Sequence, residues 1–276
     1  MSQFACHSLL STDIASVRDV ICGGGCRHRS PEECASATQL VYPYRGVFVR
    51  HVGRNDAVAE ANQVLFFNAG EPYSISHPVE GGDACLSIGV APEVLAELAP
   101  KQELRSGPVI SFRRQRRRID ARAQAMTAMV RHSLTRGAAD TLEGETLVLT
   151  LIRRSLGERT SHAATASAGR QKLADRAKLV LSSDLARRWT LAEIAQEVRV
   201  SPVYLTQVFQ QVEGMPLYRY QMRLRLARAL DLLGDYDDLT TLGMDLGFSS
   251  HSHFTASFRQ AYGRTPAEFQ RSVRLR

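Results

Sequence analysis

Cysteine is the residue type in this sequence whose spacing most directly suggests chemistry. Cys22, Cys26 and Cys34 lie close together in the chain, and Arg27 and His28 follow Cys26 directly. Thiolates at this spacing can hold a soft metal ion in tetrahedral or trigonal geometry, or they can act as a redox pair. A plainer interpretation is a set of idle cysteines near a glycine-rich turn, since the spacing is not the Cys-x-x-Cys of common zinc sites. Cys22, Cys26 and Cys34 are therefore a candidate metal or redox site, with no cofactor certain.

The composition argues against a membrane span and leans toward a negatively charged partner. No run of about 18 apolar residues occurs, and the first residues, MSQFACHSLLSTD, lack the pattern of a secretion signal, so we expect a cytoplasmic protein with no membrane partner. The net charge is +7, and residues 170–276 hold 16 Lys and Arg against 11 Asp and Glu. Most of this excess is arginine, which suits phosphate and guanine contacts, although a GC-rich genome would produce the same bias.

The first part of the chain reads as strands followed by helices. Segments 38–53, 62–68 and 84–90 alternate apolar with polar residues between Gly and Pro turn signals, which predicts a small β-barrel or sandwich over about 36–111. A short helix at 92–98 and two longer ones at about 115–135 and 140–158 follow. The basic run 112–118 is expected to be solvated surface at a helix start. The small, polar segment 159–170 predicts a linker between domains 1–158 and 171–276.

Residues 171–276 are expected to be helical and contain an internal near-duplication. The segment 191–209 matches 239–258 at an offset of 48 before its turn and 49 after it, so the second copy has one extra residue in the turn. Each copy predicts a short helix, a tight turn and a second helix. In the first copy Ser201 can cap the second helix, and Pro202 fits its first position. A long helix over 216–233 joins two such helix-turn-helix units.

The second helix of each unit leaves a polar face exposed if its apolar residues point inward. With Leu205, Val208 and Phe209 buried, the outward residues of the first unit are Val203, Thr206, Gln207 and Gln210. Those of the second unit are His251, Ser252, Thr255, Ala256 and Arg259. Such short, polar faces fit base edges in a major groove. One copy alone would be an ordinary exposed helix, but two copies held about one DNA turn apart, roughly 34 Å, favour a DNA-binding protein.

These motifs resemble the AraC/XylS family of bacterial transcription regulators over about residues 171–272. The segments SPVYLTQVFQQVEG, RLRLARALDLL and GFSSHSHFTASFRQAYGRTPAEFQ carry the resemblance, including the G-x-T-P ending at Gly263–Pro266. The resemblance implies a sequence-specific regulator or activator whose partners are promoter or operator DNA and RNA polymerase. It implies base contacts from Val203, Thr206, Gln207, Gln210, His251, Ser252, Thr255 and Ala256, and phosphate contacts from Ser201, Tyr204, Ser250, His253 and Arg259. Arg199 stands where such proteins often have glycine, which leaves the first turn's conformation open.

The N-terminal part more weakly resembles the cupin-like sensor half of such regulators. NQVLFFNAGEPYSISHP, followed by a glycine pair and Asp83, carries this resemblance. It implies a β-barrel that binds a small effector and following helices that make a homodimer through residues 115–158. We place the unknown effector near Phe48, Phe66, Tyr73 and His77. The expected fold is thus α+β, with a cupin-like barrel and dimerisation helices before an all-α DNA-binding domain.

An enzyme is the alternative kept for the N-terminal half. Metal-dependent cupin enzymes usually present two histidines and a carboxylate on one strand, then a later histidine. Here His51 and His77 are isolated, and no His-x-His stands on an expected strand. We therefore expect no catalytic residues, and a cupin-type enzyme or carrier fused to a DNA-binding module is the second interpretation.

Overall fold

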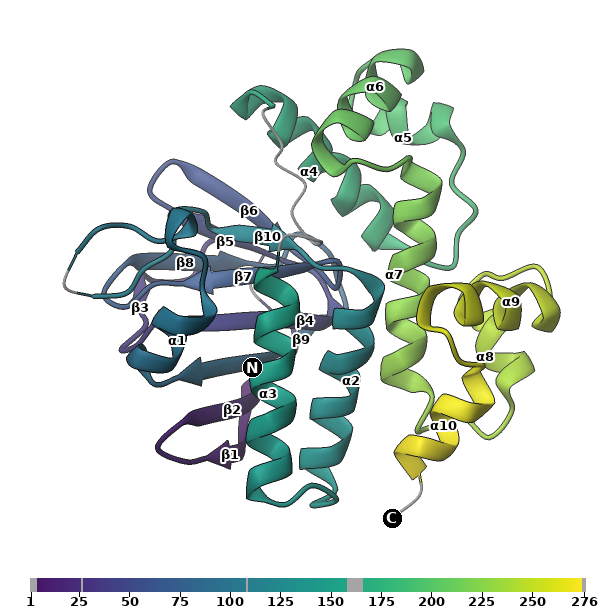
Figure 1. Cartoon of the computed structure of the whole chain (residues 1–276). Helices are drawn as coiled ribbons and strands as arrows, with labels where there is room; N and C mark the ends of the chain where they lie inside the picture. The colour runs from purple at the N-terminus through teal and green to yellow at the C-terminus, as the bar shows by residue number, and fades with distance from the viewer. Residues whose placement is uncertain (1–3, 26, 108, 158–165, 275–276) are drawn as a thin grey trace. The chain divides into compact units, whose positions relative to one another are not determined.

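The chain forms two compact units, the first built of strands and helices and the second of helices (Figure 1). The computed structural model describes residues 4–25, 27–107, 109–157 and 166–274. The first unit runs to Ser161, and the second spans His162–Ser272. None of the helices among these described residues is both long and apolar enough to cross a membrane. The predicted α+β class is confirmed.

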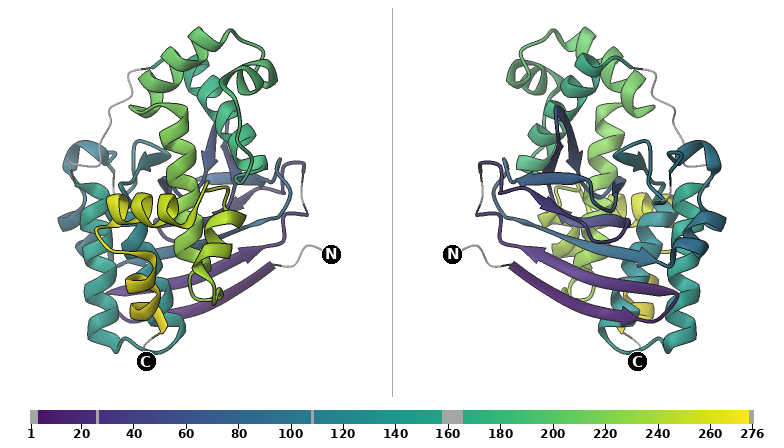
Figure 2. Two further views of the ribbon diagram at one scale, coloured as in Figure 1. Left: turned by 90° about the vertical axis from the view of Figure 1, so that its right-hand side faces the viewer. Right: turned by 90° about the vertical axis from the view of Figure 1, so that its left-hand side faces the viewer.

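The strands of the first unit form two antiparallel sheets, ordered β1-β2-β9-β4-β7-β10 and β3-β8-β5-β6. The ladders of the described strands join them into these two sheets and not into one closed barrel. Strands predicted within 38–53, 62–68 and 84–90 are confirmed as β4, β5, β7 and β9. The sequence predicted no strand before residue 36, yet β1 and β2 form a hairpin at the sheet edge (Figure 2). The bounds are β1 Phe4–Ser11, β2 Ala15–Cys22, β3 Glu33–Cys34, β4 Gln39–Gly46, β5 Phe48–Val52, β6 Asn55–Ala59, β7 Gln63–Phe67, β8 Pro72–Ser76, β9 Asp83–Val90 and β10 Arg116–Arg118.

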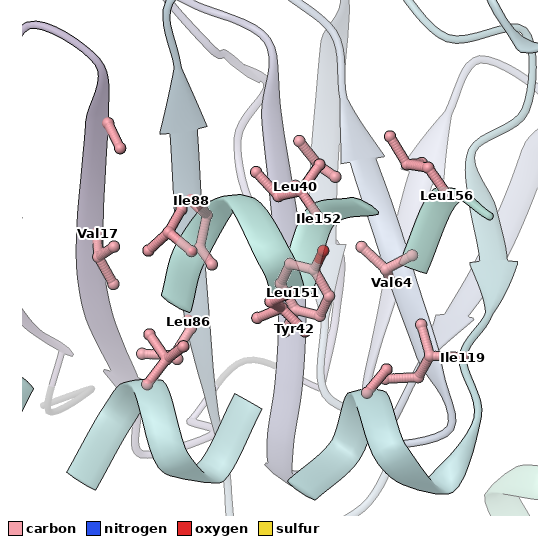
Figure 3. Packing of buried hydrophobic residues seen from close by; sticks show 14 of the residues in the cluster. Val17, Leu40, Tyr42, Val64, Leu86, Ile88, Ile119, Leu151, Ile152 and Leu156 are labelled. Carbon is pink, nitrogen blue, oxygen red and sulfur yellow. The ribbon is translucent and has the colours of Figure 1, made fainter. Parts of the chain in front are cut away.

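Strand alternation gives the six-stranded sheet one face toward helices and one toward the smaller sheet. Helices α2 (Ala121–Thr135) and α3 (Thr141–Leu156) cover the first face, after the short α1 (Pro92–Leu98) and a 3-10 turn at Lys101–Glu103. Figure 3 shows the strand side chains that meet α3 in this core, namely Val17, Leu40, Tyr42, Val64, Leu86 and Ile88, opposite Leu151, Ile152 and Leu156. The opposite face of the sheet is left to line a cavity.

The first long helix begins at Ala121, later than the predicted start near residue 115. Asp120 is its N-cap, and the Asp120 carboxylate accepts the Ala123 N–H at 2.9 Å. Arg116–Arg118 instead form β10, paired with β7. The prediction of a helix start is therefore wrong. The prediction of a solvated surface holds for Arg113 and Arg114, which are exposed, but not for Arg117, which is only 8% exposed and donates to the Gly157 carbonyl at 2.8 Å.

The second unit contains the two predicted helix-turn-helix units, α5–α6 and α8–α9, joined by α7. Residues 198–201 connect the first pair and residues 246–250 the second, so the extra turn residue is confirmed. Helix α4 begins at Ala168, inside the predicted linker, whose residues 159–165 lie outside the described part of the chain. The bounds are α4 Ala168–Ser183, α5 Leu191–Glu197, α6 Pro202–Glu213, α7 Leu217–Leu232, α8 Leu239–Asp245, α9 His251–Tyr262 and α10 Pro266–Arg274.

Candidate nucleic-acid interface

Helix α6 begins after Ser201 and ends before Gly214, as the sequence predicts. Ser201 is the N-cap, and its hydroxyl accepts the Tyr204 N–H at 3.2 Å while Pro202 occupies the first turn. Gly214 ends the helix in the left-handed conformation at φ 64°, which glycine adopts without steric cost. These caps fix which residues of α6 point toward the core and which point outward.

The inward and outward faces of α6 are those predicted from the sequence. Leu205, Val208 and Phe209 are at most 2% exposed. Val203, Thr206, Gln207 and Gln210 are all exposed, and the apolar Val203 reaches 67%. The outward face carries no charged side chain, because Glu213 is buried against Lys178 of α4 at 2.6 Å. Its amide and hydroxyl groups are of the kind that hydrogen-bond base edges.

Helix α9 repeats this arrangement with different side chains. Ser250 is its N-cap, and the Ser250 hydroxyl accepts the His253 N–H at 3.1 Å. Phe254 and Phe258 are fully buried. The outward residues share one open hollow of about 720 Å³, lined by His251, Ser252, Thr255, Ala256, Arg259, Gln260 and Thr265. The outward residues predicted from the sequence are thus among those that line this hollow, whose concave shape the structure adds.

Several outward side chains of both helices are already hydrogen-bonded, which fixes their rotamers. The Thr206 hydroxyl donates to the Pro202 carbonyl at 2.6 Å, so it faces a partner as an acceptor. The Thr255 hydroxyl and His251 Nε2 lie 3.3 Å apart. His253 Nδ1 lies 3.0 Å from the Ser249 hydroxyl. Side chains that are held in place lose less conformational entropy when a partner binds.

The turns of the two units share one unusual backbone conformation. Arg199 has φ 57°, and it is the non-glycine residue with positive φ among the described residues. Gly247 holds the matching position in the second unit at φ 81°. The first turn therefore has the left-handed conformation of the second, even though arginine is strained there.

Arg225 of α7 ties both units to the joining helix. The Arg225 guanidinium donates to the carbonyls of Leu185, at 2.6 Å, and of Gly247, at 2.9 Å. It also donates to the carbonyls of Ala186 and Arg187, which precede α5. Arg225 is 6% exposed, and burial lowers the pKa of its guanidinium. The sequence did not reveal this role, because an arginine on a helix normally indicates a surface position.

The first unit contains a cavity of about 400 Å³ between the two sheets, on the face of the six-stranded sheet that is not covered by helices. Three of the four residues predicted to hold an effector line it, namely Phe48, Tyr73 and His77. The prediction of Phe66 is wrong for this cavity. Phe66 points to the helix side of β7, where it stacks on Phe112 with ring centroids 3.9 Å apart, and its neighbour Phe67 lines the cavity. Burial, followed by the nearby Glu33, raises the pKa of the Tyr73 phenol to about 12.

Two of the three cysteines that the sequence grouped, Cys22 and Cys34, have different surroundings in the structure. Cys22 ends β2 and lines the cavity. Cys34 lies on β3, is exposed and is not among the lining residues, and Cys26 lies outside the described residues. Cys6 and Cys85 line the cavity instead, although neither was predicted there. Burial raises the pKa of the Cys85 thiol well above its usual range, which makes it a poor nucleophile.

Comparison with known proteins finds matches to the second unit. Residues 194–272 match the family model of a helix-turn-helix domain. The transcriptional regulator GadX of Escherichia coli O6:H1 is 35% identical over 92 residues, which are 33% of each protein. The regulator ArgR of Pseudomonas aeruginosa is 34% identical over 93 residues, covering 33% of this chain and 28% of ArgR. The match thus spans about a third of the length of these relatives.

Some solved structures are similar to the second unit alone, and others to nearly the whole chain. An AraC-type DNA-binding domain protein from Chromobacterium violaceum is 29% identical with a TM-score of 0.37, covering 40% of this chain and 98% of its own. ToxT from Vibrio cholerae is 13% identical with a TM-score of 0.39, covering 95% of this chain and 98% of its own. These scores are too low to carry an argument by themselves. The family model therefore identifies residues 194–272 of the second unit as a helix-turn-helix domain, and the sequence relatives that share this part of the chain are transcription regulators.

Proposed function

We propose that this chain is a sequence-specific DNA-binding transcription regulator controlled from its N-terminal unit. The duplicated helix-turn-helix unit carries the proposal, since α6 and α9 each bury an apolar face and present a polar one. Helix α7 has 16 residues, a length of about 24 Å. This helix joins the two helix-turn-helix units of the C-terminal half. Such a connection suits two DNA-reading helices that enter successive major grooves on the same face of the DNA.

The proposed contacts divide into two kinds. Val203, Thr206, Gln207 and Gln210 of α6, with His251, Ser252, Thr255 and Ala256 of α9, would meet base edges. The apolar Val203 and Ala256 suit thymine methyl groups. Ser201, Tyr204, Ser250, His253 and Arg259 would meet phosphates, together with the backbone N–H groups at the two helix starts. Ser201 and Ser250 accept backbone N–H bonds as caps, which leaves each O–H able to donate to a phosphate.

The first unit would bind the effector in its cavity and provide a dimer contact. Leu142 of α3 is 71% exposed, and Leu149 lies one heptad further on the same helix, half-buried and outside the core. These two leucines, which the core does not use, suit contact with a second copy. Sedimentation of the full chain tests this part: a dimer that Leu142→Glu converts to monomer supports it, and an unchanged species opposes it. RNA polymerase is the further partner that a regulator of this kind requires.

Selection of bound sequences from random DNA, followed by affinity measurement, tests the proposed function. We expect a preferred sequence and an affinity that falls steeply between 50 mM and 200 mM salt, because each neutralised phosphate releases counterions. Binding without sequence preference, or binding that salt leaves unchanged, would contradict it. The relatives in the comparison are transcription regulators, so no specific observation favours an enzyme fused to a DNA-binding module.

A further inference from the structure

Three side chains with metal-ligand chemistry meet at one end of the cavity in the first unit. Cys22 is the last residue of β2 and Asp83 the first of β9, and the ladder between these strands pairs the two residues directly. His77 follows β8 of the other sheet, and its Nε2 lies 2.6 Å from Asp83 Oδ1. One ligand atom from each of the three lies within 4.8 Å of the others. Strand register thus brings together residues that are up to 61 positions apart in the sequence.

His77 also carries a ring nitrogen that the protein does not satisfy. The residue is 5% exposed, and Asp83 occupies Nε2. The other nitrogen, Nδ1, is buried and has no hydrogen-bond partner. Buried polar atoms of native proteins nearly always have a partner, and an ion or ordered water is the usual explanation when the chain supplies none. A cation held by both Nε2 and Asp83 would replace the hydrogen bond between them, and Nδ1 would then be left to an ordered water in the cavity that His77 lines.

The donor set selects the kind of ligand. A thiolate, an imidazole and a carboxylate together suit zinc and similar borderline-soft divalent cations, whereas calcium and magnesium prefer oxygen ligands alone. Bonds of about 2.0–2.3 Å to zinc place its ligand atoms about 3.3–3.8 Å apart. The three ligand atoms lie within 4.8 Å of one another, so small shifts reach that spacing, with His77 Nε2 and Asp83 Oδ1 moving apart from 2.6 Å as the ion replaces their hydrogen bond. The other charged residues lining the cavity, Arg18 and Glu33, have opposite signs, so Asp83 and the Cys22 thiolate would make the lining attractive to a cation.

The register of the strands disfavours a disulfide among the described cysteines. Cys6 and Cys85 both pair with Val20, on either side of β2, so one strand separates them. Cys22 is the diagonal neighbour of Cys85 on β9 and of Cys6 on β1. The typical Cα separation of such neighbours is about 7–8 Å, beyond the usual range for a disulfide. Cys34 is exposed on β3 and does not line the cavity. The described geometry therefore supports a metal ligand at Cys22 better than a thiol pair.

We propose that Cys22, His77 and Asp83 bind one zinc-like divalent cation, with a further coordination position open to the cavity. Three protein ligands with an open position are typical of zinc sites that accept an exogenous ligand. The ion, or a small molecule bound to it, would be the signal that the first unit senses. Only this sensing role depends on the proposed function, because ion binding can be measured without DNA.

Titration of the full-length, reduced, metal-free chain with Co²⁺ and Zn²⁺ tests the site. We expect one ion per chain, a thiolate-to-cobalt charge-transfer band, and displacement of Co²⁺ by Zn²⁺. Cys22→Ser should abolish the band, and Cys22→Ser, His77→Gln and Asp83→Asn should each weaken Zn²⁺ binding about tenfold or more. Cys34→Ser is the matched control and should leave both readouts unchanged. Thermal unfolding of the metal-free variants verifies that each one folds.

Two results would overturn the metal site. One is the absence of a stoichiometric ion in the wild-type chain. The other is an equal loss of binding in Cys34→Ser and Cys22→Ser, which would move the site to the loop cysteines. For the sensing role, DNA affinity is measured with and without Zn²⁺. An affinity that changes only in chains with an intact site supports the role, and one that Zn²⁺ leaves unchanged refutes it. Failure to bind DNA in both states would contradict the proposed function and not the metal site.

Discussion

Gln207 is an exposed carboxamide near the middle of the outward face of α6, between Val203 and Gln210. A glutamine in this position can bind adenine through both ends of its amide. We expect Gln207→Ala to relax the preference at one base pair at a cost of about 1–3 kcal/mol, measured by affinity for single-base variants of the selected DNA. Gln196→Ala on α5 removes an equally exposed glutamine and should leave the preference unchanged. A loss that is the same for every sequence would assign Gln207 to a phosphate instead.

Arg225 is the residue of α7 that we expect to contribute most to the stability of the second unit. Its guanidinium satisfies the carbonyls of residues 185–187 and of Gly247, in a place where water has little access. We expect Arg225→Met to lower the free energy of unfolding by about 2–4 kcal/mol, since buried carbonyls lose charged donors. Arg219→Met changes an exposed arginine of the same helix and should be nearly neutral. Chemical denaturation measures both, and an effect below about 0.5 kcal/mol at Arg225 would refute the role.

The turn of each helix-turn-helix unit is the element in which backbone conformation limits the sequence. A Cβ on Gly247 would lie 2.2 Å from the Ala186 carbonyl oxygen, and φ is 81° there. Gly247→Ala should therefore destabilise the second unit by more than about 2 kcal/mol. Gly263 has a similar φ of 75° but nothing within 4 Å of its Cβ position, so Gly263→Ala should cost about 1 kcal/mol.

At the matching turn of the first helix-turn-helix unit, substitution of Arg199 by glycine should raise the stability and not lower it. Arginine at φ 57° is strained, so Arg199→Gly should stabilise the chain by up to about 1 kcal/mol, less the entropy that glycine adds to the unfolded state. The melting temperatures of Gly247→Ala, Gly263→Ala and Arg199→Gly measure these effects. Equal effects of Gly247→Ala and Gly263→Ala would show that conformation alone, and not the approach of Ala186, sets the cost.

The first helices of both units begin at acidic caps that respond to pH. The Thr190 side chain, then its backbone N–H, then Arg187, lower the pKa of Glu193 to about 2. The Thr241 hydroxyl, then backbone N–H groups, lower the pKa of Asp238 to about 2. A carboxylate whose pKa is lower when folded contributes stability above its unfolded pKa and loses it as the pH falls through the folded value. The melting temperature should thus fall between about pH 4.5 and 2, and less so in Glu193→Gln; an identical fall in that variant would exclude the cap as a cause.

The sequence predicted those elements whose pattern is local. The spacing of Leu205, Val208 and Phe209 marked the inner face of α6, and Ser201 and Gly214 marked its ends, because caps and helical periodicity involve neighbours in the chain. Such local patterns do not reveal which strands pair when they are distant in the sequence. The strand at Arg116–Arg118 exists only because β7 accepts it, and three arginines carry no alternation.

The candidate sites show the same limit. Phe66 and Phe67 are adjacent aromatic residues on β7, and alternation alone does not reveal which of them faces a cavity. Cys22 was grouped with its sequence neighbours, whereas the ladder of β2 and β9 places it beside Asp83. His77 was assigned to an organic effector, and its meeting with Cys22 and Asp83 depends on the arrangement of two sheets. Residues whose partners are distant in sequence thus require the fold.

At the scale of the whole molecule, the proposed function assigns sensing to the first unit and DNA binding to the second. The second unit carries the exposed polar faces of α6 and α9, and the first carries the cavity with Cys22 and His77. A cation or effector that alters the first unit can regulate DNA binding only if it binds one state of the chain more tightly than another. The Zn²⁺ dependence of DNA affinity therefore measures the coupling between the units directly.

Methylation interference on the selected DNA tests the central claim, that two helices read two successive major grooves, most directly. Methylation of guanine N7 obstructs the major groove, so we expect two clusters of interfering positions, centred about 10 base pairs apart on one face of the duplex. Gln207→Ala should weaken one cluster and His251→Ala the other. A single cluster, or interference that neither variant alters, would contradict the claim that α6 and α9 both read bases.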